Sequence, residues 1–374
     1  MRFSFKFLHL SFELLFMFGL FQKSAFGFDI SDTSLEMVEF QKKGGKVVLS
    51  AVGRMILTKG VIEDGKIMDE AKLAAAISDL CSKTQPQKIS TKQVIASLPE
   101  SKIFTHHFKL PITIQANDLA GALKFEAEGV VPASQDELLF DYKIIKKDAG
   151  KQEILYVAAF KNIAESYART LRLAGLEPLA LDAEALSIAR SLIKVYNKDE
   201  AVLIIDIGAK ETALSIFDQD GIRFSRDLPI AGDFFTKIIA AKLKMSWDQA
   251  ENMKITCGLD LDCEDGRILL VLQQSLEKIS REIIKGIRYY ENEIGRKVAR
   301  GVLVGGTAYL TGFAEYFQDN LMIPCEWGRP WIVSDQSPIS SSLLLTNAIG
   351  LALRGVESDP AKAGINLLPV GGGK

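Results

Sequence analysis

The sequence contains few of the residues that usually build metal centres, disulfide networks and nucleophilic active sites. Its 374 residues include only four cysteines and three histidines. His106 and His107 are adjacent, so on a strand their side chains would face opposite sides. No two cysteines have CxxC spacing, and no histidine lies near the two that are closest; the four are Cys81, Cys257, Cys263 and Cys325. We therefore expect no zinc site, disulfide scaffold or histidine-based nucleophile, and the cysteine usage is typical of a reducing compartment.

The charge balance and the missing motifs exclude further classes of protein. With 45 basic and 47 acidic residues the net charge is −2, which gives no overall attraction to nucleic acid or to an anionic membrane. The GxSxG, HExxH and GxxxxGK(S/T) motifs are also missing. The length predicts two domains, or one domain with large insertions.

The first residues lack an uninterrupted apolar run. Residues 1–21 combine a basic start with apolar residues, but His9 and Glu13 interrupt them and no A-x-A cleavage site follows. A transmembrane helix needs about 20 predominantly apolar residues, and a signal peptide needs a clean apolar core. Our preferred interpretation is that translation begins at Met17. The alternatives are that residues 1–16 form a membrane-associating segment or part of a signal peptide.

Two stretches of the chain share one order of features, in which a buried strand ends at an acid and a hairpin follows. Residues 201–224 reach Asp206 at the end of an apolar run, and residues 25–57 reach Asp29 in the same way. The segments DISDTSLEMVEF and DIGAKETALSIF align with Asp29 opposite Asp206. For one stretch alone, a hairpin with a solvated aspartate is an equally good interpretation. Two in one chain predict duplicated halves facing a phosphate and its Mg²⁺.

The remaining pattern predicts an α/β protein with an insertion. Strands and helices between residues 93 and 177 predict a small inserted α+β domain. Asp69 and Ser246 are predicted N-caps of helices over 69–81 and 247–254. Apolar residues spaced by three and four predict one long helix over 266–295. Further helices are predicted at 182–195, 234–243 and 340–353, and a buried strand ends at Gly305-Gly306.

This order of elements resembles the actin-like ATPase fold of actin, Hsp70, hexokinase and the cell-division protein FtsA. From Met17 onward, nearly the whole chain is similar to the PilM family, which are cytoplasmic actin-like proteins of type IV pilus assembly. The stretches that carry the resemblance include FGLFQKSAFGFDIS, AESYARTLRLAGLEP, IIDIGAKETALSI and VLVGGTAYLTGFAEYF. FtsA and Hsp70 do not share the second of these, which makes the match specific. Family members also begin with a similar short lead, which favours Met17 as the start.

The resemblance implies an architecture. The fold would be α/β, with two lobes of duplicated ribonuclease H-like units around a nucleotide cleft and a small inserted α+β (1C-like) domain. The expected boundaries are 17–92 and 178–200 for the first lobe, 93–177 for the insertion, 201–335 for the second lobe, 336–357 for a final helix on the first lobe, and 358–374 for a flexible tail.

The resemblance also implies a binding site for ATP and Mg²⁺. By position, the first phosphate loop would contain Asp29, Ser31, Asp32 and Thr33, and the second Asp206, Gly208, Ala209, Lys210 and Thr212. Asp29 and Asp206 would hold Mg²⁺ through water. Gly305, Gly306 and Thr307 would lie against the adenosine. Glu282 and Lys285 would reach the ribose or base, unless they form a surface ion pair.

Several positions depart from the family pattern. Ser31 replaces a usual glycine, so we expect strain if the backbone needs a positive φ. Glu36 replaces a usual lysine, Thr307 replaces the third glycine of a run, and Lys210-Glu211 replaces small hydroxyl residues. We expect nucleotide binding to survive these changes and hydrolysis to be slow or absent.

The resemblance implies a peptide partner as well. The family is similar to a clamp for the N-terminal peptide of the inner-membrane protein PilN, whose motif looks like INLLP. Here the motif is in the chain's own tail, as Ile365, Asn366, Leu367, Leu368 and Pro369. The tail is expected to be either disordered or docked between the first lobe and the insertion. Docking could occur in cis, or in trans with self-association.

The expected function is a cytoplasmic, ATP-binding assembly scaffold at the inner-membrane face, with no nucleic-acid partner and only indirect membrane association. One alternative is a polymerising, FtsA-like cytoskeletal ATPase, which would need an amphipathic membrane-targeting helix that residues 358–374 do not form. Another is a sugar-kinase-like enzyme, which would need a catalytic aspartate beside a substrate pocket.

Overall fold

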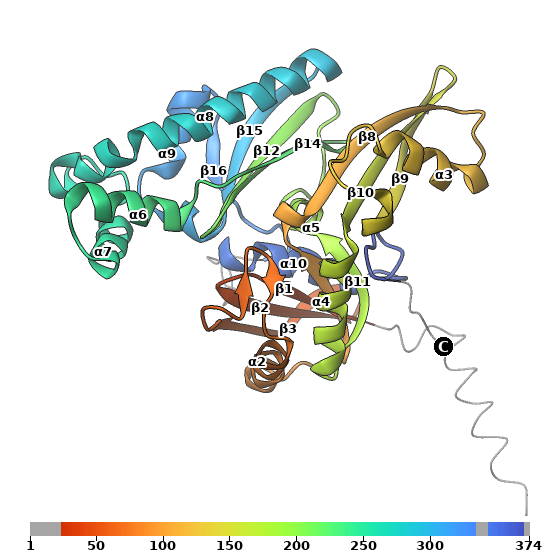
Figure 1. The fold of residues 1–374 in the computed structure, drawn as a ribbon, viewed down its shortest axis with the longest axis horizontal. Helices are drawn as coiled ribbons and strands as arrows, with labels where there is room; N and C mark the ends of the chain where they lie inside the picture. Colours follow the sequence, from red (N-terminus) through yellow and green to blue (C-terminus); the bar gives the residue numbers. More distant parts are fainter. Residues whose placement is uncertain (1–23, 334–342, 370–374) are drawn as a thin grey trace, which may run out of the picture.

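The computed structural model describes residues 24–333 and 343–369. These residues form two lobes and a smaller unit, each built around its own sheet (Figure 1). The sheets have six, five and three strands, and a two-stranded ribbon of β4 (Ile62–Glu63) and β5 (Lys66–Ile67) completes the set. The predicted start at Met17, the interpretations of residues 1–16 and the final glycine run lie outside the described residues.

The first-lobe sheet has the strand order β11-β7-β1-β2-β3-β6. Its centre is an antiparallel meander, with β7 and then β11 added in parallel beside β1. The strands are β1 (Phe26–Ile30), β2 (Ser34–Lys43), β3 (Lys46–Ile56), β6 (Gln85–Pro86), β7 (Gln93–Leu98) and β11 (Glu177–Ala183). β11 is therefore an edge strand, a position that matters for the tail.

The second-lobe sheet repeats this arrangement. Three antiparallel strands are followed by two strands added in parallel beside the first of them. The strands are β12 (Glu200–Ile207), β13 (Thr212–Asp218), β14 (Gly221–Leu228), β15 (Lys297–Val304) and β16 (Cys325–Trp327). Asp29 lies next to the last residue of β1, and Asp206 lies next to the last residue of β12. The predicted duplication of the two halves is confirmed.

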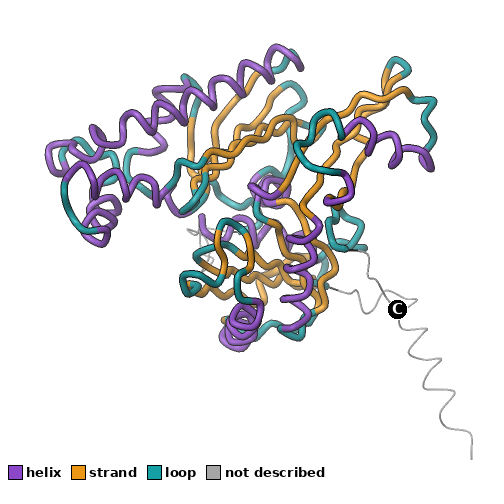
Figure 2. Tube along the Cα trace, viewed as in Figure 1, coloured by secondary structure: helices purple, strands orange, loops and turns teal. Residues whose placement is uncertain are grey.

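Helices cover both faces of the first-lobe sheet (Figure 2). α2 (Glu70–Lys83) and α4 (Lys161–Leu173) pack on the face that carries Phe26 and Phe28. α5 (Glu184–Leu192) and α10 (Thr346–Gly355) lie on the opposite face, where Gly27 leaves room for α10. Successive strand residues point to opposite faces, so one glycine between two phenylalanines sets how closely α10 approaches.

The second lobe has helices on its outer face and shares its inner face with the first lobe. α6 (Gly232–Leu243), α7 (Trp247–Cys257), α8 (Arg267–Ile294) and α9 (Phe313–Leu321) enclose the outer core. On the inner face, Ile204 and Val304 join the same cluster as Ile188 of α5. The predicted N-cap at Asp69, the capping box at Ser246 and the long helix are confirmed.

The small unit is a three-stranded sheet with a helix at its side. It contains β8 (Ile103–Pro111), α3 (Ala116–Ala127), β9 (Leu138–Asp148) and β10 (Lys151–Phe160), with a separate hydrophobic core. We expected the insertion to span 93–177, but β7 pairs with β1 and α4 packs in the first-lobe core. Because β7 and α4 bury their apolar side chains in the first-lobe core, they belong to the first lobe and not to the insertion.

Three further expectations differ from the structure. The predicted helix over 182–195 begins only at Glu184, because residues 177–183 form the edge strand β11 beside β7. The last helix begins at Thr346, and residues 340–342 of the prediction are not described. Cys257 and Cys263, whose spacing we took as an argument against a disulfide scaffold, form a disulfide. The chain reverses at Gly258, which brings the two Cα atoms to 5.3 Å.

The packing of α10 gives the first test. A methyl group on Gly350 would overlap the carbonyl oxygen of Ser187 in α5, whereas one on Gly121 of α3 would meet nothing. Gly350→Ala should therefore lower the free energy of unfolding by about 1–3 kcal/mol or more. Gly121→Ala should leave it unchanged or raise it by up to about 1 kcal/mol. Urea unfolding of both variants measures this, and equal midpoints would contradict the packing described.

Candidate functional site

A cleft of about 690 Å³ separates the two lobes. Both acid-tipped hairpins open into it, as does the turn after β15. Most of the predicted site residues line the cleft, namely Asp29, Ser31, Asp32, Thr33, Asp206, Gly208, Ala209, Lys210, Gly305, Gly306 and Thr307. The duplicated topology is what brings them together, since each set lies at the corresponding end of its own sheet.

The first loop is held by its own side chains. The Ser31 hydroxyl accepts a hydrogen bond from the Ser34 backbone N–H at 3.0 Å and donates to the Ser34 carbonyl at 3.1 Å. Ser31 does not have a positive φ, so the condition under which we expected backbone strain is not met. The Asp32 carboxylate accepts the N–H groups of Asp64 and Gly65 at 2.8 and 2.9 Å. These side-chain hydrogen bonds hold the first loop to itself and to the turn at residues 64–65.

The second loop rests on the start of α6. The Gly208 carbonyl accepts from the Gly232 N–H at 3.1 Å, and the Ala209 carbonyl accepts from the Asp233 N–H at 2.8 Å. Lys210 forms an ion pair with Asp233 at 3.1 Å. This ion pair holds Lys210, which stands where small hydroxyl residues are usual, at the edge of the cleft.

The third segment depends on close backbone approach. Gly305 has φ +86° and lies so near Asp206 that a Cβ would overlap its carboxylate. The Thr307 hydroxyl donates to the Gly208 carbonyl at 2.8 Å, which ties this segment to the second loop. Glycine at 305 is therefore required by both φ and space, and Thr307 uses its hydroxyl for a contact within the fold.

The cleft gathers half-buried carboxyl groups from both lobes. Burial and the neighbouring Glu36 raise the pKa of Asp29 to about 8. Burial and Asp29 raise the pKa of Asp206 to about 7, and burial and Glu100 raise that of Asp227 to about 8. One carboxylate oxygen of Asp29 and one of Asp227 are buried with no hydrogen-bond partner. Repulsion and desolvation together make this a place where a cation would be stabilised.

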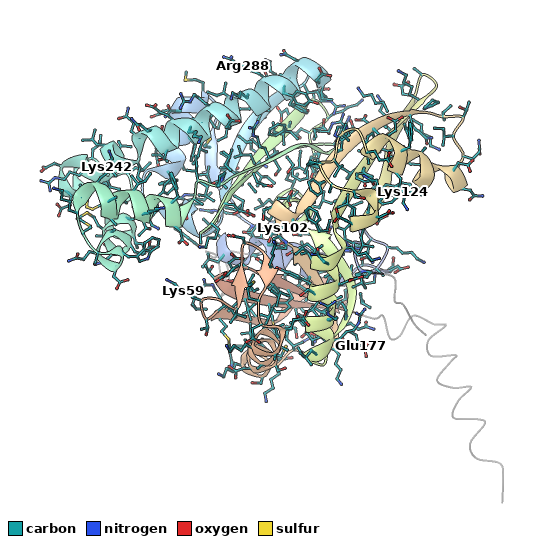
Figure 3. The ribbon with its side chains drawn as sticks, in the orientation of Figure 1. Lys59, Lys102, Lys124, Glu177, Lys242 and Arg288 are labelled. Carbon is teal, nitrogen blue, oxygen red and sulfur yellow. A yellow bond between two sulfur atoms is a disulfide. The ribbon has the colours of Figure 1, made fainter. Side chains whose placement is uncertain are left out.

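Basic side chains also reach the cleft. Arg54 lies opposite Glu36 on the adjacent strand and pairs with it at 2.8 Å, so a basic group is present beside the acid that replaces the usual lysine. Lys102 lies between the lobes (Figure 3) and also lines the cleft. The site therefore offers groups for both an anion and a cation.

Three predicted residues do not line the cleft. Thr212 is buried and donates its hydroxyl to the Ile230 carbonyl at 2.7 Å. Glu282 and Lys285 pair with each other at 2.7 Å, and Glu282 pairs with Arg226 at 2.9 Å. The surface ion pair, which was the alternative interpretation, is what the structure shows.

Sequence reasoning missed a second glutamate–lysine pair with the same spacing. Glu251 and Lys254 of α7 both line the cleft and pair at 2.8 Å. Lys254 also donates to the Gly232 carbonyl at 3.0 Å and to the Thr236 hydroxyl at 2.9 Å. The i, i+3 spacing was a signal for both pairs, but only the tertiary fold shows which pair faces the cleft.

One contact links the two lobes outside the lining of the cleft. The Lys59 ammonium, on the first lobe (Figure 3), lies 6.0 Å from the ring centre of Trp247 at the start of α7. This is the outer limit for a cation–π contact, which makes it a weak bridge.

The donor set fits Mg²⁺ bound together with a phosphate. Carboxylate oxygens are the ligands Mg²⁺ prefers, and it usually keeps several waters and takes one or two carboxylates plus phosphate oxygens. Within residues 24–333 and 343–369, no three acidic, histidine or cysteine side chains form a ready-made metal site. The unpartnered oxygen of Asp29 and the acidic surroundings of Asp206 fit a cation held partly through water.

The predicted tail motif is docked rather than flexible. Ile365 and Leu367 are 3% and 1% exposed and belong to the first-lobe core cluster. The tail lies against β11 of the same chain, with the inserted sheet beside it. Of the three expectations for this segment, docking in cis is the one that the structure shows.

A family model described as type IV pilus assembly protein PilM matches residues 27–356. The chain belongs to the PilM family. Curated relatives include cell division protein FtsA of Pseudomonas aeruginosa, 26% identical over 219 residues, which are 52% of each chain. FtsA of Streptococcus pneumoniae is 22% identical over 78% of this chain and 72% of its own. The chain thus spans about half the length of the Pseudomonas relative.

Solved structures support the actin-like ATPase fold for this PilM-family chain. A PilM–PilN type IV pilus biogenesis complex has a TM-score of 0.76 at 24% identity, covering 90% of this chain and 99% of the other. MreB 5 of Spiroplasma citri bound to AMPPNP has a TM-score of 0.53 at 14% identity, covering 90% and 95%. Across the part of the chain that the structure describes, no helix is long and apolar enough to cross a membrane.

The raised carboxyl pKa values predict a pH dependence of stability. An acid whose pKa is raised on folding keeps its proton up to a higher pH in the folded state than in the unfolded state. The ligand-free protein should therefore lose stability as the pH rises from 6 to 8.5. For each such acid, the free energy of unfolding falls by up to about 1.4 kcal/mol per pH unit. Asp227→Asn should flatten this decline, because it removes a charge that burial opposes.

The matched control is Asp199→Asn, at an exposed position. Urea midpoints at several pH values measure the decline. If wild type and Asp227→Asn lost stability equally over this range, Asp227 would not be the buried acid described above.

Proposed function

We propose that the chain is a nucleotide-binding scaffold of type IV pilus assembly, and that ATP with Mg²⁺ occupies the cleft. The observation that carries the proposal is the meeting of two acid-tipped hairpins, from duplicated halves, at one cleft. The fold shared with MreB 5 bound to AMPPNP supports the same class of ligand.

The two hairpin loops would bind the phosphates from opposite sides. Ser31 and Thr33 would contribute from the first lobe and Ala209 and Lys210 from the second, as backbone N–H groups near a turn attract anions. Asp29 and Asp206 would hold Mg²⁺ through water. The bound cation would offset the repulsion among the carboxylates and the charge of the phosphates.

The adenosine would lie near the turn after β15. Gly305 and Gly306 allow close backbone approach there, and Thr307 fixes the turn to the second loop. Glu251 and Lys254 of α7 line the same cleft and replace Glu282 and Lys285 as the charged pair proposed near the ribose or base.

We propose a structural role for the nucleotide, with slow hydrolysis at most. Asp32 and Lys210 are already engaged, with the backbone of residues 64–65 and with Asp233. Groups that hold the fold in this way are suited to setting the angle between lobes.

We propose that the partner is the N-terminal peptide of a PilN-like inner-membrane protein. The PilM–PilN complex shares the fold over 90% of this chain, and a docked INLLP-like segment is present at the junction of the first lobe and the insertion. The chain would then act in the cytoplasm, at the inner-membrane face.

A polymerising, FtsA-like ATPase is the second candidate, because the curated relatives given above are FtsA proteins. Sedimentation with and without ATP·Mg²⁺ separates the two. The scaffold proposal expects no ATP-dependent pellet.

The nucleotide claim is tested by thermal unfolding with and without ATP·Mg²⁺. A ligand present at 100 times its Kd stabilises the folded state by about 2.7 kcal/mol, so wild type should melt at a higher temperature when it is added. Asp206→Asn should melt at or above the ligand-free wild type, because it removes a repelled charge, yet should show a much smaller ligand shift.

Asp199→Asn is the control and should shift as wild type does. If ATP·Mg²⁺ left the melting temperature of wild type unchanged, the nucleotide proposal would fall and only a peptide-binding scaffold would remain.

A further inference from the structure

The tail is bound to the open edge of the first-lobe sheet. The Leu367 N–H donates to the Leu181 carbonyl at 2.8 Å, so the tail pairs with β11 through the main chain. The Asn366 N–H donates to the Asp141 carboxylate of β9 at 2.8 Å. Two units of the fold therefore hold one short segment, and we call the tail-contacting groups of Asp141, Leu179, Leu181 and Arg354 the tail seat.

The Asn366 side chain uses both ends of its amide. Its oxygen accepts the N–H groups of Leu181 at 3.2 Å and Leu368 at 3.0 Å. Its NH₂ group donates to the carbonyls of Leu179 at 3.1 Å and Ala361 at 3.3 Å. An aspartate in its place could accept but not donate when ionised, so the seat specifies an asparagine at this position.

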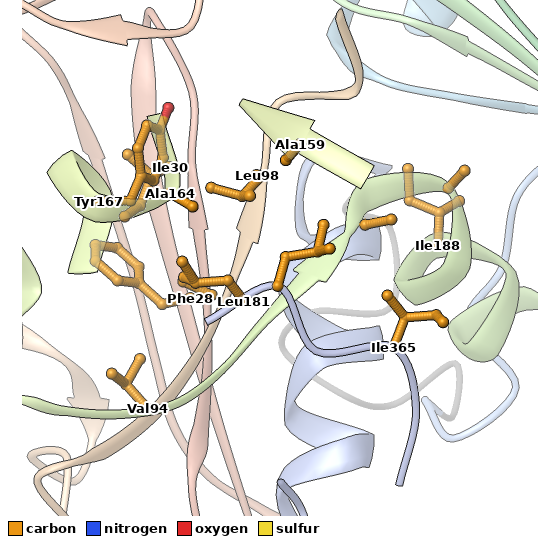
Figure 4. Close-up of a cluster of buried hydrophobic side chains, with 14 of the residues drawn as sticks. Phe28, Ile30, Val94, Leu98, Ala159, Ala164, Tyr167, Leu181, Ile188 and Ile365 are labelled. Carbon is orange, nitrogen blue, oxygen red and sulfur yellow. The ribbon is translucent and has the colours of Figure 1, made fainter. Parts of the chain in front are cut away.

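Two apolar side chains flank the asparagine in the sequence and enter the core. Ile365 points into the cluster that contains Leu181 and Ile188 (Figure 4). Leu367 is also buried, and Leu368 packs partly against the same cluster. The apolar–Asn–apolar sequence therefore matches a set of polar contacts that lies between two apolar sites, and such alternation gives specificity to a peptide bound along a sheet edge.

A buried arginine shapes the connection to the tail. Arg354 of α10 is fully buried and pairs with Asp182 at 2.8 Å. It also donates to the carbonyls of Pro360 at 2.8 Å and Ile365 at 2.6 Å. Arg354 contacts the tail only by donating to main-chain carbonyls, so it could donate equally well to the backbone of another segment.

We propose that residues 364–369 are a cis-bound ligand of a peptide site, and that their release opens the tail seat to an extended Ile-Asn-Leu-Leu-Pro peptide from another chain. Residues 364–369 follow α10 after a connector in which residues 357–359 are exposed and Pro360 is buried, and they dock at a sheet edge. The part of the proposal that concerns a PilN-like peptide rests on the proposed function. The cis occupancy and its specificity do not.

The experiment measures binding of a labelled peptide, AGINLLPV, by fluorescence anisotropy. A chain that ends at Glu357 should bind it at least about tenfold more tightly than the full chain, which holds its own copy. The full chain with Asn366→Asp should also bind it, because its tail is weakened. The peptide AGIDLLPV should not bind the shortened chain.

Two controls keep the result interpretable. The shortened chain loses buried side chains, so its fold is checked by the ATP·Mg²⁺ melting shift and by circular dichroism, and Asn366→Asp provides a full-length alternative. Asp141→Asn in either background should weaken peptide binding, whereas Asp148→Asn, exposed on the same strand, should not.

The outcomes separate this proposal from the proposed function. Equal peptide binding by the full and shortened chains, or none by a folded shortened chain and by Asn366→Asp, would overturn the cis ligand. A tail-dependent dimer in sedimentation would overturn it too, in favour of a second copy. Binding of AGINLLPV without binding of a PilN-type N-terminal peptide would support it while removing the proposed partner.

Discussion

The structure depends on carboxyl groups that two duplicated strands bring to the same cleft. Asp29 and Asp206 occupy corresponding places in the two sheets, and each raises the cost of ionising the acidic groups around it. In a ligand-free protein this arrangement opposes closure of the lobes, because like charges are desolvated together. A cation bound with phosphate, as proposed above, would offset that repulsion. The cleft is therefore a place where ligand binding and the angle between the lobes are expected to be linked.

One short segment connects the cleft with the tail seat. β11 carries the main-chain groups of Leu179 and Leu181 that hold the tail, and α5 begins directly after it with Glu184, which lines the cleft. Asp182 lies between them, where it pairs with Arg354 and Arg190. These four residues all lie in one continuous segment, residues 179–184, that runs from β11 into α5. A scaffold that has to relate nucleotide state to peptide occupancy would need such a connection.

Much of this fold could be predicted from the sequence, because the strand–acid–hairpin order occurs twice and the long helix has an unbroken apolar stripe. The boundaries of the insertion could not, since β7 and α4 are assigned by partners far away in the sequence. The choice between two glutamate–lysine pairs failed for the same reason: Glu251 and Glu282 have equivalent local spacing, and only the packing of α7 and α8 distinguishes them. The disulfide between Cys257 and Cys263 could not be predicted, because it depends on a reversal of the chain at Gly258 that the residue spacing alone does not reveal.

The central claim is that one Mg²⁺-nucleotide contacts both halves of the chain at once. Hydrogen exchange followed by mass spectrometry tests it most directly, with the protein alone and with ATP·Mg²⁺. We expect slower exchange in residues 30–34 and 207–211 together, with the same dependence on ATP concentration, and little change in the inserted sheet. Protection of only one loop, or of neither, would contradict a nucleotide held between the two duplicated halves.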